Sequence, residues 1–157
     1  MVEDYEHIKN TRNKILEQLQ EDTILEDLLG AELEEDVNFF HDDIVIIMTQ
    51  QFPAISCVCL NWPSGNDPSG QKAMDLNWRL RAYTKIIPAS DASDMNLKLG
   101  SRVGYVLDLD KNKYTDCWYE SRVTKREFEN AEDYNSAEKI SRRSEILFTT
   151  KQFVDRD

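Results

Sequence analysis

Asp108, Asp110 and Asn112 are spaced like the first ligands of a calcium-binding loop. The chemistry would be oxygen coordination of a hard cation, which also needs a glycine at the sixth position and an acid at the twelfth. This sequence has Lys113 and Tyr119 there, so the pattern fails where the loop geometry demands a match. We therefore interpret the segment as a turn.

Two further groups of possible metal ligands are also better explained without a metal ion. His41, Asp42 and Asp43 are adjacent, and successive side chains on a strand point in different directions, so we interpret them as a solvated charge run. Cys57 and Cys59 share one face of an apolar strand, but zinc would need a second ligand pair at suitable spacing. We expect reduced thiols, no metal and no cofactor.

The two histidines do not indicate nucleophilic catalysis. His7 falls on a predicted helix and His41 beside a predicted strand, and neither has a nucleophile motif near it. The loop WPSGNDPSG lacks the lysine and the helix start of a phosphate-binding loop. We expect no enzymatic activity, although a site assembled from scattered acids stays open as an alternative.

The net charge of −11 lies in the first quarter of the chain. Residues 1–43 contain 14 acidic and 3 basic residues, whereas residues 44–157 contain 16 of each. Such a segment is either a solvated surface or a negative surface that faces a basic partner or repels DNA. Direct nucleic-acid binding is disfavoured, because it needs a basic footprint. The N-terminus is not a secretory signal, and no apolar run is long enough to cross a bilayer.

The segment AMDLNWRLRAYTKI, residues 73–86, alternates apolar and polar residues and predicts a central strand. Its polar side carries Arg79 and Arg81, for which we consider cross-strand pairing with acids or contact with a partner. Helices are predicted from Tyr5 to Gln20, with Tyr5 on the apolar stripe, and after Asp91 as cap, to Leu107. The first pattern resumes at residues 24–29 and stops at Gly30. Further strands are predicted at residues 44–49, 52–60, 117–128 and 143–154.

These elements predict one α+β domain with a small, mostly antiparallel sheet of four to five strands and two helices packed on one face. An acidic connector is expected at residues 30–43 and a polar loop at residues 61–72. Gly100 and Gly104 lie one turn apart, which indicates close packing of the second helix on the sheet. Trp62, beside the polar loop, is either a core edge or a contact anchor.

In its organisation the chain resembles the tail terminator (tail-to-head joining) proteins of long-tailed bacteriophages. The resemblance lies in the helix YEHIKNTRNKILEQL, the strands FPAISCVCL and LNWRLRAYTKI, the helix DMNLKLGSRVGYVLDL and the final RRSEILFTTKQFV. It covers approximately Tyr5 to Val154. The acidic insertion between Glu21 and Asp43 departs from the family pattern and affects the first helix and the lining of the ring.

The resemblance implies a small α/β protomer that assembles into a ring, commonly a hexamer. Such a ring caps the tail tube, stops its polymerisation and docks the neck of the head, while DNA passes through without specific binding. It implies as partners other copies of the chain, the tail tube protein and a neck or head-completion protein. The expected location is the tail–neck junction of the virion, after synthesis in the host cytoplasm, with no membrane involved.

The family has no residue motif specific enough to transfer to this sequence, so the interface and lumen-facing residues are predicted from the sequence pattern alone. We predict an assembly interface at Trp62, Asp67, Arg79, Arg81, Arg142 and Arg143. We predict that acids face the lumen of the ring at Glu34, Glu35, Asp36, Asp42 and Asp43. The alternatives are a head-completion or connector protein of the neck and, in another class, a monomeric cellular adaptor domain.

Overall fold

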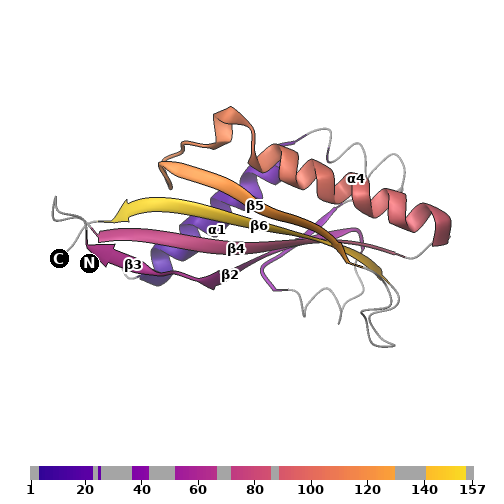
Figure 1. Ribbon diagram of the computed structural model, residues 1–157, viewed down its shortest axis with the longest axis horizontal. Coiled ribbons are helices and arrows are strands. Elements are labelled where there is room, and N and C mark those ends of the chain that lie inside the picture. The colour runs from indigo at the N-terminus through magenta and orange to yellow at the C-terminus, as the bar shows by residue number, and fades with distance from the viewer. Residues whose placement is uncertain are drawn as a thin grey trace.

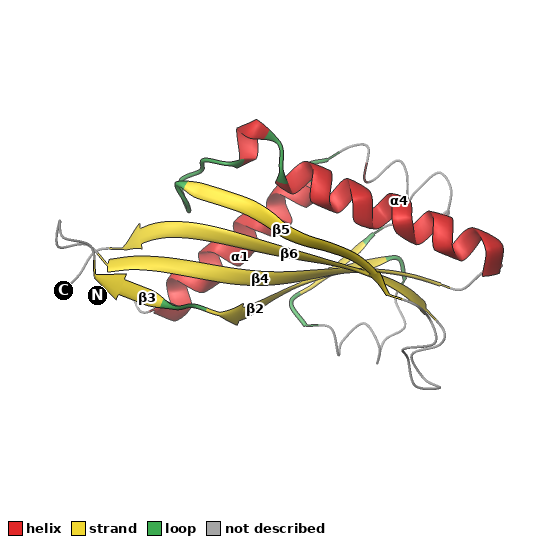
Figure 2. Cartoon of the chain, in the orientation of Figure 1, coloured by secondary structure: helices red, strands yellow, loops and turns green. Residues whose placement is uncertain are grey.

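The computed structural model describes residues 4–22, 25, 37–42, 52–66, 72–85, 89–129 and 141–154 and has the predicted α+β class. Its helices are α1 (Asp4–Gln20), α4 (Ala89–Leu107) and the short 3-10 helix η1 (Asp110–Asn112). Figures 1 and 2 show long strands in one layer with α1 behind them. The strands are β1 (Asn38–Phe40), β2 (Ala54–Asn61), β3 (Ser64–Asn66), β4 (Lys72–Lys85), β5 (Glu120–Glu129) and β6 (Ser141–Val154).

The sheet has the strand order β1-β2-β4-β6-β5, and β3 pairs with β4 off this path. Every pairing is antiparallel except that of β1 with β2. The two longest strands, β4 and β6, form the centre, and their pairing runs without a break from Lys72↔Val154 to Lys85↔Ser141. The mostly antiparallel sheet predicted from the sequence is confirmed.

The alternation in β4 sets which of its faces is buried. Met74, Leu76, Trp78 and Leu80 are fully buried, and the polar residues between them are only partly covered. Each buried side chain contributes about 1.5–3 kcal/mol, so a one-residue slip of register would be strongly unfavourable. The indole nitrogen of Trp78 also donates a hydrogen bond of 3.1 Å to the hydroxyl of Thr150 on β6.

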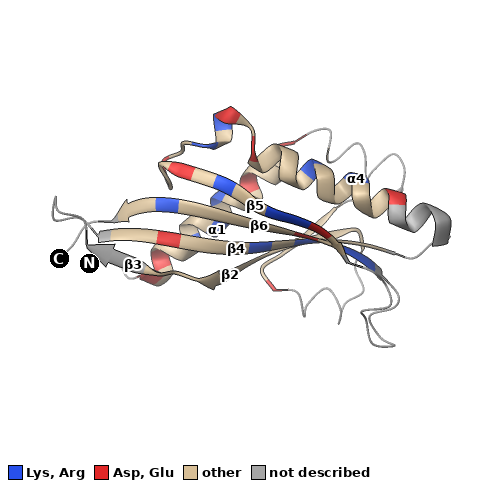
Figure 3. Ribbon diagram, viewed as in Figure 1, with Lys and Arg blue, Asp and Glu red and all other residues tan. Residues whose placement is uncertain are grey.

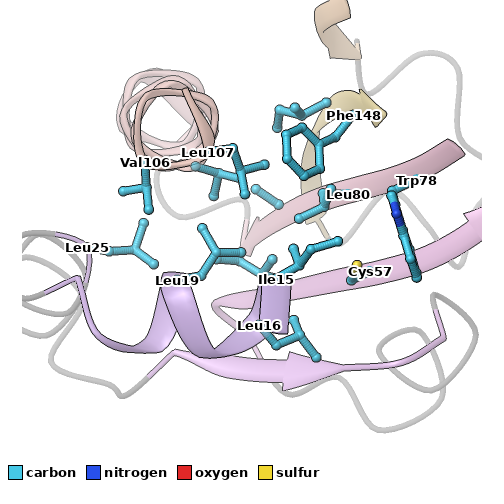
Figure 4. Close-up of a cluster of buried hydrophobic side chains, with 14 of the residues drawn as sticks. Ile15, Leu16, Leu19, Leu25, Cys57, Trp78, Leu80, Val106, Leu107 and Phe148 are labelled. Atoms are coloured by element: carbon cyan, nitrogen blue, oxygen red, sulfur yellow. The ribbon is translucent and has the colours of Figure 1, made fainter. Parts of the chain in front are cut away.

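Both helices contribute to one hydrophobic core on that face of the sheet. Figure 4 shows Ile15, Leu16 and Leu19 of α1 gathered with side chains of α4 and of the strands. The cluster includes Trp78 and Leu80, so both helices pack against the same side of β4. The contributing residues of α4 are Leu99, Val103, Val106 and Leu107.

The glycines of α4 let it approach the sheet closely, as predicted. A Cβ built on Gly100 would lie 2.6 Å from the Cβ of Ser144 on β6. A Cβ built on Gly104 would lie 2.6 Å from Nε of Arg126 on β5. The first neighbour is fixed to a strand backbone, whereas the second is part of a flexible side chain, so Gly100 is the tighter contact.

Asn96 fixes α4 to the two central strands from a fully buried position. Its side-chain nitrogen donates hydrogen bonds to the carbonyl oxygens of Ala82 and Arg142, both at 3.0 Å, and to the Thr84 hydroxyl at 3.2 Å. Its side-chain oxygen accepts a hydrogen bond from the Ser144 hydroxyl. This buried amide is therefore satisfied by its partners, as buried polar groups usually are.

Two segments predicted as irregular contain short strands. Within the expected acidic connector at 30–43, Asn38–Phe40 forms β1, because Phe39 packs against the main core and Phe40 against a smaller cluster. Within the expected polar loop at 61–72, Asn61 ends β2, Ser64–Asn66 forms β3 and Lys72 begins β4. The predicted strand at 44–49 and most of the predicted helical pattern at 24–29 lie outside the described residues.

The element boundaries were predicted less well than the elements. α4 begins at Ala89, so Asp91 is the third helical residue and not its cap, where an acid still favours the helix N-terminus. β5 begins at Glu120, because the Thr115 hydroxyl accepts hydrogen bonds from the amides of Cys117 and Trp118 in a turn. Tyr5 was predicted on the apolar stripe of α1 but is 60% exposed.

Candidate assembly surface

The face of the sheet turned away from the helices is the open face, formed by the odd-numbered residues of β4 and β6 and their register partners. In the described part of the chain, its charged side chains are six basic and four acidic, a net charge of +2 in a chain of −11. Figure 3 shows several basic positions along β4, β5 and β6. The basic side chains are Arg79, Arg81, Arg122, Lys125, Arg143 and Lys151, and the acidic ones Asp75, Glu120, Glu127 and Glu145.

Three arginines surround one carboxylate at the centre of the open face. Glu145 is directly opposite Arg81 in the register, and their side chains form an ion pair of 3.3 Å. Arg79 Nε lies 4.0 Å from the same carboxylate oxygen. Burial and then the positive charge of Arg81 lower the pKa of Arg143. The predicted pairing of Arg79 and Arg81 with an acid across the sheet is confirmed, and positive charge is in excess locally.

β5 is the edge strand of the sheet on the side away from β2. Its pairing with β6 shifts register between Val123 and Lys125, which marks a β-bulge. Lys125 is about half-exposed and pairs with Glu127 at 2.6 Å. A charged, bulged edge resists strand-to-strand aggregation, so β5 offers side chains for contact and not a bare row of backbone groups.

Trp62 lies outside the core, with 48% of its surface exposed. The sequence predicted either a core edge or a contact anchor at this position, and this exposure favours the contact anchor. It precedes Pro63, whose carbonyl accepts a hydrogen bond from the Asp75 amide at the start of β4. Phe153, near the end of β6, is at the same end of the sheet and stacks on Tyr119 with ring centroids 4.7 Å apart. This end therefore presents exposed aromatic groups.

The other predicted interface residues do not all join the open face. Arg143 lies on it beside Tyr83, but Arg142 is opposite Thr84 and therefore belongs to the helix-covered face. The alternation of a strand separates two adjacent residues in this way. Asp67 lies outside the described residues.

Of the predicted lumen-facing acids, only Asp42 is among the described residues, and it is exposed. It follows His41, whose pKa is lowered by burial and by the nearby positive charge of Arg12. Glu34, Glu35, Asp36 and Asp43 lie outside the described residues. Their orientation in a ring stays a prediction.

Two of the three possible calcium ligands, Asp108 and Asn112, are engaged elsewhere. Asp108 forms an ion pair of 2.5 Å with Arg126, and the Asn112 amide nitrogen donates to the carbonyl of Val106. Asp110 is exposed at the start of η1, which matches the predicted turn. Within the described ranges, no group of three or more His, Cys, Asp or Glu side chains is arranged to hold a metal ion.

None of the three cysteines forms a disulfide, and the two partly buried thiols have little nucleophilic character. Cys57 is buried, and Cys59 and Cys117 are partly buried. Burial raises the pKa of the Cys59 thiol and, with help from the nearby Asp116, that of Cys117. Raised values keep the thiols protonated near neutral pH, which is the opposite of an activated cysteine.

Sequence reasoning missed Glu145 as the acid that pairs with the arginines, because the register of β4 against β6 was needed to place it. It also missed the stack of Tyr119 on Phe153, which joins residues far apart in the chain. A detectable signal existed for α1, where Glu6, Asn13 and Glu17 recur at helical spacing on the side opposite Ile15.

No protein-family model matches the sequence, and no curated protein gives a significant match to it. Across the part of the chain that the structure describes, no helix is both long enough and apolar enough to span a membrane. The fold, the charge distribution and the exposed groups are therefore the features of the molecule that bear on its function.

Proposed function

We propose that this chain is a structural virion protein, a tail terminator of a long-tailed bacteriophage. Its copies form a ring, of about six protomers in the family it resembles, that caps the tail tube and joins it to the neck of the head. The ring needs no catalytic chemistry. Its role is to end tube polymerisation, to offer a docking surface to the neck and to let DNA pass.

The observation that carries the proposal is a two-layer protomer whose opposite sides differ in charge. Helices cover one face of the sheet, and the open face carries a net +2 while the whole chain carries −11. Closed rings are built from head-to-tail contacts, in which one patch meets a different patch of the neighbour. Unlike surfaces on one small domain are what such contacts require.

Two further features suit the partners of such a ring. The exposed aromatic groups Trp62, Tyr119 and Phe153 lie at one end of the sheet, where they offer an axial contact to the tube or the neck. The acidic first quarter of the chain disfavours retention of DNA, because a binding surface for phosphates would be basic.

The experiment is electron microscopy and light scattering of the purified protein alone and with tail tube protein. We expect rings at the ends of tubes, and tubes that stop growing once the ring is bound. Binding to headless tails separates a terminator from a head-completion protein, which would join heads first. A mass of one 18.3 kDa chain at every concentration, with and without tube protein, would favour the monomeric adaptor and overturn the proposal.

A further inference from the structure

The outward side of α1 is an acidic stripe. Its exposed acids are Glu6 and Glu17 on the helix and Glu21 directly after it, and they recur with Asn10, Asn13 and Gln20 without an exposed lysine or arginine within α1. The three basic residues of α1 lie on its flanks and are partly buried, at Lys9, Arg12 and Lys14. The stripe is opposite Ile15 and Leu19, which face the core.

The acidic stripe and the open face therefore lie on opposite sides of the protomer. α1 lies behind the strands in the view of Figure 1. It packs its apolar side against the inner face of the sheet, so its stripe points away from the strands. The open face points the other way and has an excess of basic side chains around Glu145. A contact between these two surfaces cannot form within one chain and must join two copies.

The dimensions of the two surfaces are compatible. α1 has 17 residues and is about 26 Å long at 1.5 Å per residue. β4 and β6 have 14 residues each and span about 46 Å at 3.3 Å per residue. The full length of one helix can thus lie along the two central strands of the open face.

We propose that in the ring the acidic stripe of one copy docks on the open face of the next. The inference rests on the proposed function, because it names the two patches of its head-to-tail contact. A second copy is favoured over nucleic acid as the occupant, since the rest of the chain carries −13 and would repel phosphates approaching the same surface.

The test reverses charge on each surface separately. The face variant is Arg122→Glu with Lys125→Glu, two exposed bases of β5, and the helix variant is Glu17→Lys with Glu21→Lys. Controls with the same changes of net charge at other exposed positions are Lys111→Glu with Lys113→Glu and Asp94→Lys with Asp110→Lys. Circular dichroism checks that all variants fold.

We expect each of the two variants to bind its own copies at least about tenfold more weakly, which is about 1.4 kcal/mol, and the controls to assemble like the wild type. An equal mixture of face and helix variants should recover assembly, because every mixed contact then joins opposite charges. Native mass spectrometry should find the two variants in equal numbers. Unreduced assembly of either variant, or a mixture that does not recover, would overturn the contact.

The outcome separates this contact from the proposed function. If wild-type rings cap tubes and the charge-reversed variants assemble as well as the wild type, the proposed contact is wrong and the terminator role stands. If the charge reversals weaken assembly but the wild-type assemblies never bind tubes, the proposed contact stands and the terminator role is wrong. A wild-type protein that does not assemble under any of these conditions would overturn both.

Discussion

Asp22, two residues after the end of α1, accepts two hydrogen bonds of 2.8 and 2.7 Å from Arg102 of α4. The guanidinium also lies over the ring of Tyr105, with its carbon 4.7 Å from the ring centroid. Both charged groups are mostly buried, with exposed side-chain fractions of 12% and 19%. A bidentate, partly desolvated ion pair of this kind contributes more to the stability of the fold than a surface ion pair does.

This pair predicts a pH-dependent stability. The hydrogen bond from Arg102 lowers the pKa of Asp22 below its ordinary 3.8, so the stabilisation is present above pH 3.8 and is lost as the pH falls through the lower folded value. Asp22→Asn should lower the free energy of unfolding by about 1–2 kcal/mol at pH 7. Urea unfolding at pH 7 and at pH 3 should show that the difference in unfolding free energy between Asp22→Asn and the wild type is smaller at the lower pH. A constant difference would show that charge is not the cause.

At the scale of elements, the contact of α4 with the sheet depends on two glycines with different neighbours. Gly100 faces the Cβ of Ser144, whose position is fixed by the pairing of β6 with β4. Gly104 faces the side chain of Arg126, which is exposed and can move. The same substitution therefore has opposite consequences at positions one helical turn apart.

We predict that Gly100→Ala lowers the free energy of unfolding by about 1–2 kcal/mol, because the added methyl group overpacks against β6. Gly104→Ala should be neutral or stabilising by up to about 1 kcal/mol, because alanine favours the helix and Arg126 can shift. Chemical denaturation of both variants measures the difference directly, each serving as the control of the other. Equal effects would mean that helix propensity, and not contact with Ser144, decides both.

The sequence was informative about elements where local pattern and burial agree. The alternation of Met74, Leu76 and Trp78 predicted both the strand and its buried face, because a period of two leaves no other arrangement. β1 could not be predicted in the same way, since three residues show no period and Phe39 and Phe40 gain their partners from β2 and the core. The surface around Glu145 needed the pairing register, which local patterns do not contain.

For the whole molecule, the uneven charge is the feature with the widest consequences. The open face has a net positive charge, α1 presents acids outward, and the segment from Glu21 to Asp43 contains ten acids, with Glu21 shared with the acidic stripe. If copies form a closed ring, each surface is repeated around the axis, and its field adds across all protomers. A modest charge on one chain then becomes a strong potential in a shared channel.

The predicted acidic lumen leads to a test on assembled particles. Asp42→Lys with Asp43→Lys should leave ring and tail assembly intact, because neither residue belongs to the proposed contact between copies. The reversal should slow release of the genome, since each protomer would then attract the phosphates that pass it. The rate of DNA ejection from virions carrying the variant is the measurement, and Asp94→Lys with Asp110→Lys is a control of equal charge. Ejection at the wild-type rate would place these acids elsewhere than the channel, and slower ejection that recovers in high salt would identify electrostatic attraction as the cause.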